Sequence, residues 1–393
     1  MKILFLNHNI IWRGTFFRCL GFARELARLG HHVEIWTVAP EADLIGKTVI
    51  IDSVNIWQTP RWGNVGDHDG GYAMIDNGIR LIRSTFDAWD IVHAFDHRPN
   101  VLLPWLWLRY RERKRQGKTL FFSDWCDWWA GGGITTSRRA IAGIDRIEQR
   151  IEEKSKILSD GVTVISTVLY DRANQLAIAN EKLLLLPSGI HIASFPQYDK
   201  TTSRRLIGLP QEGPFFGFIG FSLWDLEYLA NAYSHLKRRI KNAKLLVIGG
   251  GVEERAKEVF RQRFRIGQDV FLPGVIPFSD APLYLSACDV QLLPMSDTLA
   301  NRARIPNKLF DYYASGRPIV ASDIGDTGTF VREHRTGIAA REGEAVFADA
   351  CIRIVEDRSL SSACGKQARR MAETQFSYSN LVDSLLRFYQ KML

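Results

Sequence analysis

Two charged residues stand three positions apart in the stretch RIPNKLFDYYASGRPIVASDIG, which runs from Arg304 to Gly325. Lys308 carries an ammonium group that attracts phosphate, and Asp311 carries a carboxylate that can accept hydrogen bonds from two hydroxyls. Residues three apart share one face of a helix, and Pro306 suits the first turn of that helix, whose N-terminus favours anions. The pair could therefore meet one ligand; the ordinary alternative is an intrahelical ion pair on a solvated face.

A glycine loop follows the first predicted strand, in the sequence HNIIWRGTFFR. Gly14 lets backbone amides approach phosphate oxygens closely, because it has no side chain. Arg13, Thr15 and Arg18 flank it and could add positive charge and a hydroxyl. The loop therefore favours anion binding over its alternative, a plain tight turn.

The segment FSDWCDWWAGGG, residues 122–133, combines three tryptophans, two aspartates and three glycines. It follows a predicted strand, and open α/β sheets bind ligands at the carboxyl ends of their strands. Trp125 and Trp128 could stack on sugar faces, while Asp124 and Asp127 could accept hydroxyl hydrogen bonds. The alternative is that these tryptophans, with Trp129, are core packing, which is the commoner fate of aromatic clusters.

The preceding strand ends in HAFDHRPN, residues 93–100. Asp96, His97 and Arg98 are therefore expected at the same edge of the sheet. His97 is a candidate for acid–base work and Arg98 suits an anionic acceptor, although a lone histidine is more often structural.

Composition limits the class of protein that can position these residues. The chain has 393 residues, enough for two domains, and a formal charge of +8, which suits anionic ligands without choosing among them. The five cysteines show no CxxC spacing, so we expect no metal site or disulfide framework and a reducing cytoplasm. The apolar run of MKILFLNHN is too short for a signal peptide, and no stretch is long enough to span a bilayer.

The stretch VLLPWLWLRYRERKRQGK, residues 101–118, places tryptophans and aliphatic residues beside a dense basic run. Such a segment could lie on anionic lipid at the inner face of a membrane. Pro104 and the short apolar length favour the alternative, a helix that covers the sheet and has a solvated basic end.

Strands and helices alternate along the chain, which predicts doubly wound α/β domains. In the first half we expect strands at 2–6, 90–95, 119–124, 161–166 and 182–189, with a helix and a second strand after Gly14. Residues 191–213 are polar and proline-containing, and are predicted to be a linker with a short helix. The expected organisation is a domain at 1–190, this linker, a second domain at 214–375 and a C-terminal helix at 376–393.

The order of these motifs resembles the family-4 glycosyltransferases over nearly the whole chain. The matching features are Gly14, GHHV (30–33), PSGIHIASF (187–195), GFIG (217–220), LLVIGGG (245–251), LPGVIPFSDAPLYLSACDVQLLP (272–294) and PNKLFDYYASGRPIVASDIG (306–325). The resemblance implies a GT-B fold: two Rossmann-like domains facing a cleft, with the C-terminal helix crossing back to the first. It also implies retaining transfer of a sugar from a nucleotide diphosphate, with no essential metal or other cofactor.

The family usually carries two glutamates eight positions apart, the second of which binds the ribose of the donor. Asp311 stands at the second position, and the first is Ala303, which cannot do that work. The resemblance therefore implies that Asp311 holds the ribose, with Lys308 or Arg304 on the diphosphate and Asn301 or Asn307 on the sugar. Gly14 would approach the diphosphate, and backbone at Gly274 and Val275 would meet the base.

On the acceptor side, the family often has a histidine where this chain has Asp124 and Asp127. The resemblance implies that one of them replaces it, so Asp127, Asp124 and His97 are the catalytic candidates. Trp125, Trp128 and Arg98 are the acceptor-binding candidates. The acceptor would be a polysaccharide, a lipid-linked sugar or a small molecule such as a secondary metabolite.

Two departures from the family keep other functions open. The first of the two glutamates is missing at Ala303, and the run FSLWDLEY after GFIG lacks the arginine and lysine usually found there. Separately, VIGGG is no dinucleotide fingerprint, because Glu254 stands where its last glycine would be. The alternatives are a sugar-nucleotide epimerase and a non-catalytic nucleotide-sugar-binding protein. We expect no nucleic-acid binding, since the positive charge is dispersed.

Overall fold

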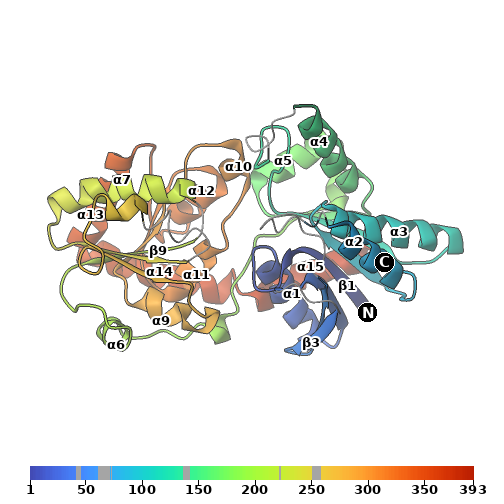
Figure 1. The fold of residues 1–393 in the computed structure, drawn as a ribbon, viewed down its shortest axis with the longest axis horizontal. Coiled ribbons are helices and arrows are strands. Elements are labelled where there is room, and N and C mark those ends of the chain that lie inside the picture. The colour runs from blue at the N-terminus through green and yellow to red at the C-terminus, as the bar shows by residue number, and fades with distance from the viewer. Residues whose placement is uncertain (41–45, 61–70, 72, 136–141, 221–222, 250–257) are drawn as a thin grey trace. The chain divides into compact units, whose positions relative to one another are not determined.

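The computed structural model describes residues 1–393 except 41–45, 61–70, 72, 136–141, 221–222 and 250–257. The last two glycines of VIGGG, Glu254 after it and the start of the FSLWDLEY run lie outside the described residues. The described chain divides into two compact units (Figure 1). Unit 1 comprises Met1–Gly189 and Tyr378–Leu393, and unit 2 comprises Ile190–Ser377.

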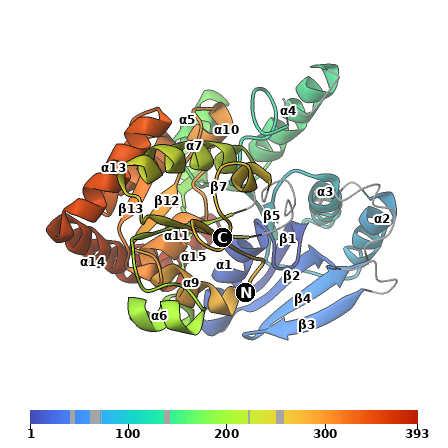
Figure 2. The ribbon, with the colours of Figure 1, turned by 60° about the vertical axis from the view of Figure 1, so that its left-hand side comes forward.

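Unit 1 is built on a sheet with the strand order β3-β4-β2-β1-β5-β6-β7-β8. Neighbouring strands are parallel except for the antiparallel pair β3 and β4, which lies at the edge in Figure 2. The strands are β1 (Lys2–Ile10), β2 (His32–Val38), β3 (Lys47–Ile51), β4 (Val54–Thr59), β5 (Ile91–Phe95), β6 (Leu120–Trp125), β7 (Gly161–Val164) and β8 (Leu183–Leu185). The helices are α1 (Phe16–Arg28), α2 (Met74–Arg83), α3 (Pro99–Arg115), α4 (Ala142–Ile157), α5 (Thr167–Gln175) and α15 (Tyr378–Met392).

The C-terminal helix α15 is part of unit 1, which confirms that it crosses back to the first domain. It lies against α1 (Figure 1), where the rings of Phe22 and Tyr378 meet edge to face at 5.0 Å. Gly21 makes this approach possible, since a Cβ there would lie 2.2 Å from the Tyr378 ring. Val382, Leu385, Phe388 and Tyr389 complete the same core.

Unit 2 has a second parallel sheet with the strand order β11-β10-β9-β12-β13-β14. Its strands are β9 (Phe215–Ile219), β10 (Lys244–Ile248), β11 (Val270–Gly274), β12 (Val290–Leu293), β13 (Ile319–Ser322) and β14 (Gly337–Ala340). Its helices are α6 (Lys200–Leu206), α7 (Leu223–Arg239), α9 (Ala281–Ser286), α10 (Leu299–Ala303), α11 (Lys308–Ser315), α12 (Gly325–Glu333), α13 (Glu344–Glu356) and α14 (Arg358–Thr374). Short 3-10 turns cover Asn180–Lys182, Ile192–Ser194 and Phe278–Asp280.

Continuous burial explains why these strands could be read from the sequence. Every residue of β5 and β12 is buried, as expected for parallel strands covered by helices on both faces. The segment predicted as a linker, 191–213, is packed into unit 2: it contains α6, and the Arg204 side chain is buried. Within the described residues, no helix is both long and apolar enough to cross a membrane.

Candidate functional site

Three glycines shape the carboxyl edge of the unit 2 sheet. Gly220 donates its amide to Ile248 O at 2.9 Å, and Gly249 donates to Gly274 O at 2.9 Å. Gly249 has a φ of +135°, and a Cβ there would lie 2.4 Å from the Gly220 carbonyl oxygen. The ends of β9, β10 and β11 therefore form a backbone ledge that a ligand can approach closely.

Lys308 brings a positive charge to this ledge. Its Nζ lies 4.0 Å from the Phe218 ring centroid, and a Cβ on Gly220 would lie 2.7 Å from it. The helix that carries it is fixed by Tyr312, whose hydroxyl accepts from Ile219 N at 3.0 Å and donates to Leu292 O at 3.1 Å. The ammonium group is thus held at the carboxyl end of β9.

Asp311 lies one turn further along α11 and is half-buried. Among the described residues, neither a hydrogen bond nor an ion pair is made by its carboxylate, so the intrahelical pair with Lys308 is not formed there. Burial raises the pKa of Asp311 to about 7. A half-buried carboxylate without a compensating partner is costly, which is a feature of groups that await a ligand.

The other donor-side candidates differ in how free their side chains are. Arg304 is half-buried and its Nε has no hydrogen-bond partner within the described structure. Asn307 precedes α11 and makes no side-chain cap. Asn301 is already engaged, since its Nδ2 donates to Ser296 O at 2.8 Å, whereas Val275 is 65% exposed after Gly274.

The corresponding edge of unit 1 begins with the Gly14 loop. Gly14 is exposed with a φ of +50°, and a Cβ there would lie 3.0 Å from the Asn9 amide group. Asn9 Oδ1 accepts a hydrogen bond from Thr15 N at 3.0 Å, which closes the turn. The turn is tight, and its glycine is required by both the conformation and the close packing.

Asp96 is the centre of a charged cluster at the end of β5. Its Oδ2 lies 3.1 Å from His8 Nδ1, and its Oδ1 lies 3.3 Å from His97 Nδ1. It has a φ of +118°, a strained conformation for a residue with a side chain. His8 was missed by the sequence interpretation, although β1 and β5 are neighbours whose ends must meet.

The electrostatics of this cluster keep the aspartate charged. Burial lowers the pKa of His8 to about 3 despite the attraction of Asp96, so this imidazole is neutral at pH 7. Burial raises the pKa of Asp96, but His8, Arg98 and His97 together lower it more, and the net shift is downward. The His97 Nε2 is buried without a hydrogen-bond partner in the described structure, although Glu148 Oε1 lies 3.7 Å away.

Trp129, rather than Trp125, is the tryptophan beside this cluster. Arg98 stacks over it with Cζ 4.2 Å from the ring centroid, and the rings of His8 and His97 lie edge-on at 6.0 and 6.5 Å. An aromatic face next to an arginine suits a sugar with an anionic substituent. The consecutive tryptophans Trp128 and Trp129 pointed to this place in the sequence. The sequence alone could not show which of the two lies beside the Asp96 cluster.

Asp124 and Trp125 lie inside unit 1, where protein groups already engage their polar atoms. Asp124 accepts two hydrogen bonds from Arg18, at 3.0 and 2.8 Å, and one from Thr163 at 2.5 Å. Trp125 is 1% exposed and donates to Glu152 Oε1 at 2.7 Å. These contacts hold both residues in place at the end of β6.

Asp127 and Trp128 lie closer to the surface, and both are half-buried. Cys126 Sγ lies 3.7 Å from Asp127 Oδ2, and Arg172 stacks on Trp128 at 3.9 Å. One face of Trp128 is thus occupied by the guanidinium group. Within the described residues, His, Cys, Asp and Glu side chains form no group of three or more arranged to hold a metal ion.

Comparison with known proteins finds similarity to glycosyltransferases. The family described as Glycosyl transferases group 1 matches residues 213–357, the segment that carries the glycine ledge, Lys308 and Asp311. The D-inositol 3-phosphate glycosyltransferase of Nocardia farcinica is 26% identical over 263 residues, which are 63% of this chain and 56% of that protein. The chain therefore spans a little over half the length of this curated relative.

Solved structures resemble the chain over its full length. Sucrose-phosphate synthase from Thermosynechococcus elongatus has a TM-score of 0.79 at 17% identity, covering 100% of this chain and 99% of that one. Anabaena HepE, solved in complex with UDP-glucose, has a TM-score of 0.70 at 16% identity, covering 99% of each chain. These likenesses confirm the predicted fold, with two Rossmann-like α/β units of the GT-B type.

Proposed function

We propose that this chain is a glycosyltransferase that moves a sugar from a nucleotide diphosphate donor to a hydroxyl acceptor. The observation that carries the proposal is the Asp311 carboxylate, which has no partner among the described residues and stands one turn along α11 from Lys308, whose ammonium group lies at the glycine ledge. These groups lie within the segment that matches Glycosyl transferases group 1. The epimerase and the non-catalytic binding protein are not favoured, because the relatives named above are sugar-transferring or sugar-phosphate-forming enzymes by name.

Each donor group has a partner of matching chemistry in unit 2. Asp311 accepts hydrogen bonds from the ribose hydroxyls, which favour its ionised form and offset the burial of the charge. Lys308 neutralises the diphosphate at Gly220, and the Nε of Arg304, which has no partner among the described residues, supplies a further donor. Val275, exposed after β11, contacts the base, and Asn307 contacts the sugar.

The reaction we propose is the retaining, family-4 type. The acceptor hydroxyl attacks the anomeric carbon on the face that the diphosphate leaves, and the departing phosphate oxygen takes the hydroxyl proton. No protein nucleophile is required, so the chain contributes positioning and charge stabilisation. No essential metal is expected, since Lys308 and Arg304 neutralise the leaving group.

The carboxyl edge of unit 1 is the proposed acceptor site. His97, held by Asp96, can orient a hydroxyl, and Asp127 can accept a hydrogen bond from another. Arg98 and Trp129 form a platform for an anionic sugar, with Trp128 beside it. A polysaccharide or a lipid-linked sugar fits this combination.

We further propose that helix α3 makes a peripheral membrane contact at the inner face. Its outer side exposes apolar side chains next to the solvent-facing basic residues 113–115. The exposed set is Leu103 at 42%, Leu106 at 38%, Trp107 at 38% and Tyr110 at 56%. Such a face binds anionic lipid through apolar insertion and charge. Leu106→Ala/Trp107→Ala should reduce sedimentation of the protein with anionic vesicles. Leu206→Ala/Phe278→Ala, which removes exposed apolar side chains outside α3, should not. Equal vesicle binding by the two double variants would exclude the contact.

A thermal-shift screen across nucleoside diphosphates and nucleotide sugars tests the donor assignment. We expect at least one nucleotide to stabilise the native chain and Asp311→Ala to abolish that shift. Asp349→Ala is the matched control, because Asp349 is 67% exposed on α13. A shift that survives in Asp311→Ala, or none with any donor, would contradict the proposal.

A further inference from the structure

A basic cavity lies at the amino edge of the unit 2 sheet. It has a volume of about 960 Å³, within the range of small-molecule sites. Its floor includes Pro214, Asp289 and Pro318, which precede β9, β12 and β13. Because these strands are parallel, the cavity lies at the edge opposite to the glycine ledge and Asp311. It is therefore a different place from the proposed donor site.

Seven cationic side chains line this cavity against two carboxylates. The cations are Lys200, Arg204, Arg317, Arg358, Lys366, Arg369 and Arg370. The carboxylates are Asp289 and Glu373, so the lining carries a formal excess of five positive charges. Such an excess attracts an anion strongly in a concave site.

Both carboxylates are already committed to protein partners. Asp289 accepts from Lys200 Nζ at 2.5 Å, from Arg204 at 2.6 Å and from the Phe215 amide at 2.7 Å. Glu373 Oε1 accepts from Arg369 Nε at 2.6 Å. These contacts account for Lys200, Arg204 and Arg369, and they stiffen the cavity wall.

Four cations remain without an ion pair in the part of the chain that the structure describes. Arg358, Lys366 and Arg370 project from α14 and are exposed, while Arg317 is half-buried. Arg317 donates to Ser286 O at 2.7 Å, but its Nε is buried and has no hydrogen-bond partner in the described segments. Burial lowers the pKa of Arg317, the direction expected for a cation whose charge is poorly balanced.

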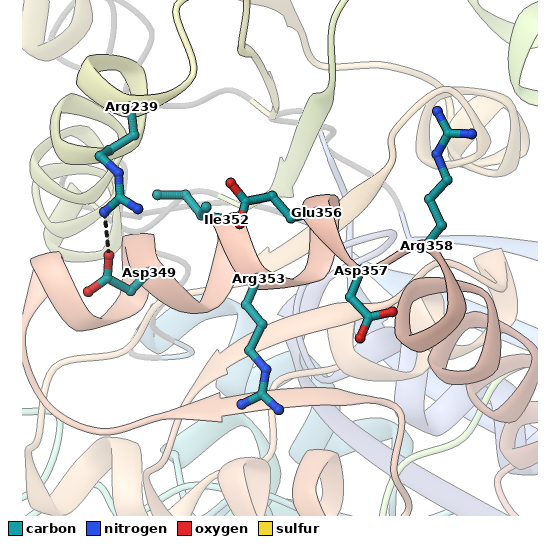
Figure 3. Close-up of a pocket in the computed structure, with 7 residues that line it drawn as sticks. All are labelled: Arg239, Asp349, Ile352, Arg353, Glu356, Asp357 and Arg358. Atoms are coloured by element: carbon teal, nitrogen blue, oxygen red, sulfur yellow. Dashed lines mark hydrogen bonds and ion pairs between the residues drawn. The ribbon is translucent and has the colours of Figure 1, made fainter.

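A neighbouring groove shows that such an imbalance is not general on this unit. That groove, shown in Figure 3, has a volume of about 760 Å³ and is lined by three arginines and three carboxylates. Arg239 and Asp349 form an ion pair at 3.2 Å across one end of it. Its charges cancel when Arg358, which lines both places, is counted with it; the cavity then still has an excess of four positive charges, so the groove gives an anion no comparable attraction.

We propose that the cavity binds the phosphate group of a small soluble phosphomonoester. Arginine forks at positions 317 and 370 match the oxygens of a dianionic phosphate, and Lys366 adds a point charge. The Ser361 and Ser362 hydroxyls, which also line the cavity, can donate further hydrogen bonds. The ligand would brace the 197–213 segment against α14, both of which contribute to the wall, and would stabilise unit 2.

Calorimetric titration with glycerol 3-phosphate and inorganic phosphate tests this site, at an ionic strength held constant with potassium chloride. We expect saturable binding by the native chain and at least tenfold weaker binding by Lys366→Gln/Arg370→Gln. Both of these side chains are exposed, so the fold should survive. Arg238→Gln/Lys241→Gln removes the same charge from exposed positions on and after α7 and should bind like the native chain.

Two further experiments distinguish this site from the proposed donor site and from a lipid-binding site. Asp311→Ala should keep its phosphate affinity, so failure of the donor assignment and failure of this one are distinguishable. Vesicles containing phosphatidic acid test a lipid headgroup as the source of the phosphate. Binding to vesicles without a response to glycerol 3-phosphate would overturn the proposal. So would a phosphate affinity of Lys366→Gln/Arg370→Gln equal to that of the native chain, or a loss of affinity in Arg238→Gln/Lys241→Gln as large as in Lys366→Gln/Arg370→Gln.

Discussion

Replacement of Asp311 by asparagine should stabilise the protein and weaken its binding of a nucleotide. The native carboxylate is half-buried without a partner in the described structure, and burial raises its pKa from 3.8 to about 7. Between these values the unfolded chain releases a proton that the folded chain retains. Stability therefore falls as the pH rises from about 4 to about 7, and the loss remains at higher pH. Asparagine keeps the shape and removes the titration.

The size of the effect follows from the shift of the pKa. One pKa unit corresponds to about 1.4 kcal/mol, so full conversion would give about 4 kcal/mol. Because solvent screens the partly exposed side chain of Asp311, we expect roughly 1–2 kcal/mol. In a unit of this size, each 1 kcal/mol moves the Tm by about 2–4 °C, so Asp311→Asn should raise the Tm at pH 8 by roughly 2–8 °C.

The opposite effect is expected on nucleotide binding. A hydrogen bond to a charged group contributes about 1.5–3 kcal/mol, so Asp311→Asn should bind the nucleotide roughly tenfold to a hundredfold more weakly. Ribose hydroxyls favour the ionised carboxylate, and native affinity should therefore rise between pH 6 and pH 8, while that of the variant should not.

Thermal unfolding at pH 4 and pH 8, with titration of the nucleotide that stabilises the native chain, measures both effects. At pH 4 the two proteins should have nearly the same Tm. A Tm that falls in Asp311→Asn at pH 8, or a gain that is equal at both pH values, would refute the argument from burial.

Three other substitutions have distinct expected outcomes. Asp124→Asn should lower the free energy of unfolding in urea by about 3–5 kcal/mol, because it leaves the buried Arg18 without its ion pair. Asp297→Asn, which breaks the exposed pair with Arg302, should lower it by only about 0–1 kcal/mol. Similar losses in the two variants would contradict a structural role for Asp124. Gly249→Ala should abolish nucleotide binding, because its Cβ would collide with the Gly220 carbonyl oxygen of the ledge. Gly267→Ala, where a Cβ meets nothing within 4 Å, should change stability alone. Titration of both variants with the nucleotide tests this difference. Asp127→Ala should spare donor binding and lower the turnover of a sugar-transfer assay, and unchanged turnover would place Asp127 outside the site.

The fold was predictable because central strands such as β5 and β12 are buried on both faces. Runs such as IVHAF and VQLL are apolar or packed throughout, and helical periodicity separates them, so their type was clear from the sequence. The antiparallel strand β3 was not predicted, since it is an edge strand whose burial alternates weakly. The packing of 191–213 was also missed, because the burial of Arg204 depends on Asp289, 85 positions away.

The candidate site was predictable only where one segment supplies the chemistry. Lys308 and Asp311 stand on one helix, but whether they pair with each other or remain available could not be decided from spacing. Asp124 was assigned a catalytic role from its place after a strand, where the family often has a histidine; its ion pair with Arg18, 106 positions away, could not be read from the sequence. His8 was missed for a similar reason: it meets Asp96 only because β1 and β5 are neighbours in the sheet.

A crystal structure of the chain with the nucleotide that stabilises it tests the central claim most directly. The account predicts the ribose hydroxyls within hydrogen-bond distance of the Asp311 carboxylate, and the diphosphate beside Lys308 and Gly220. A nucleotide bound elsewhere, with Asp311 still unpartnered, would contradict it.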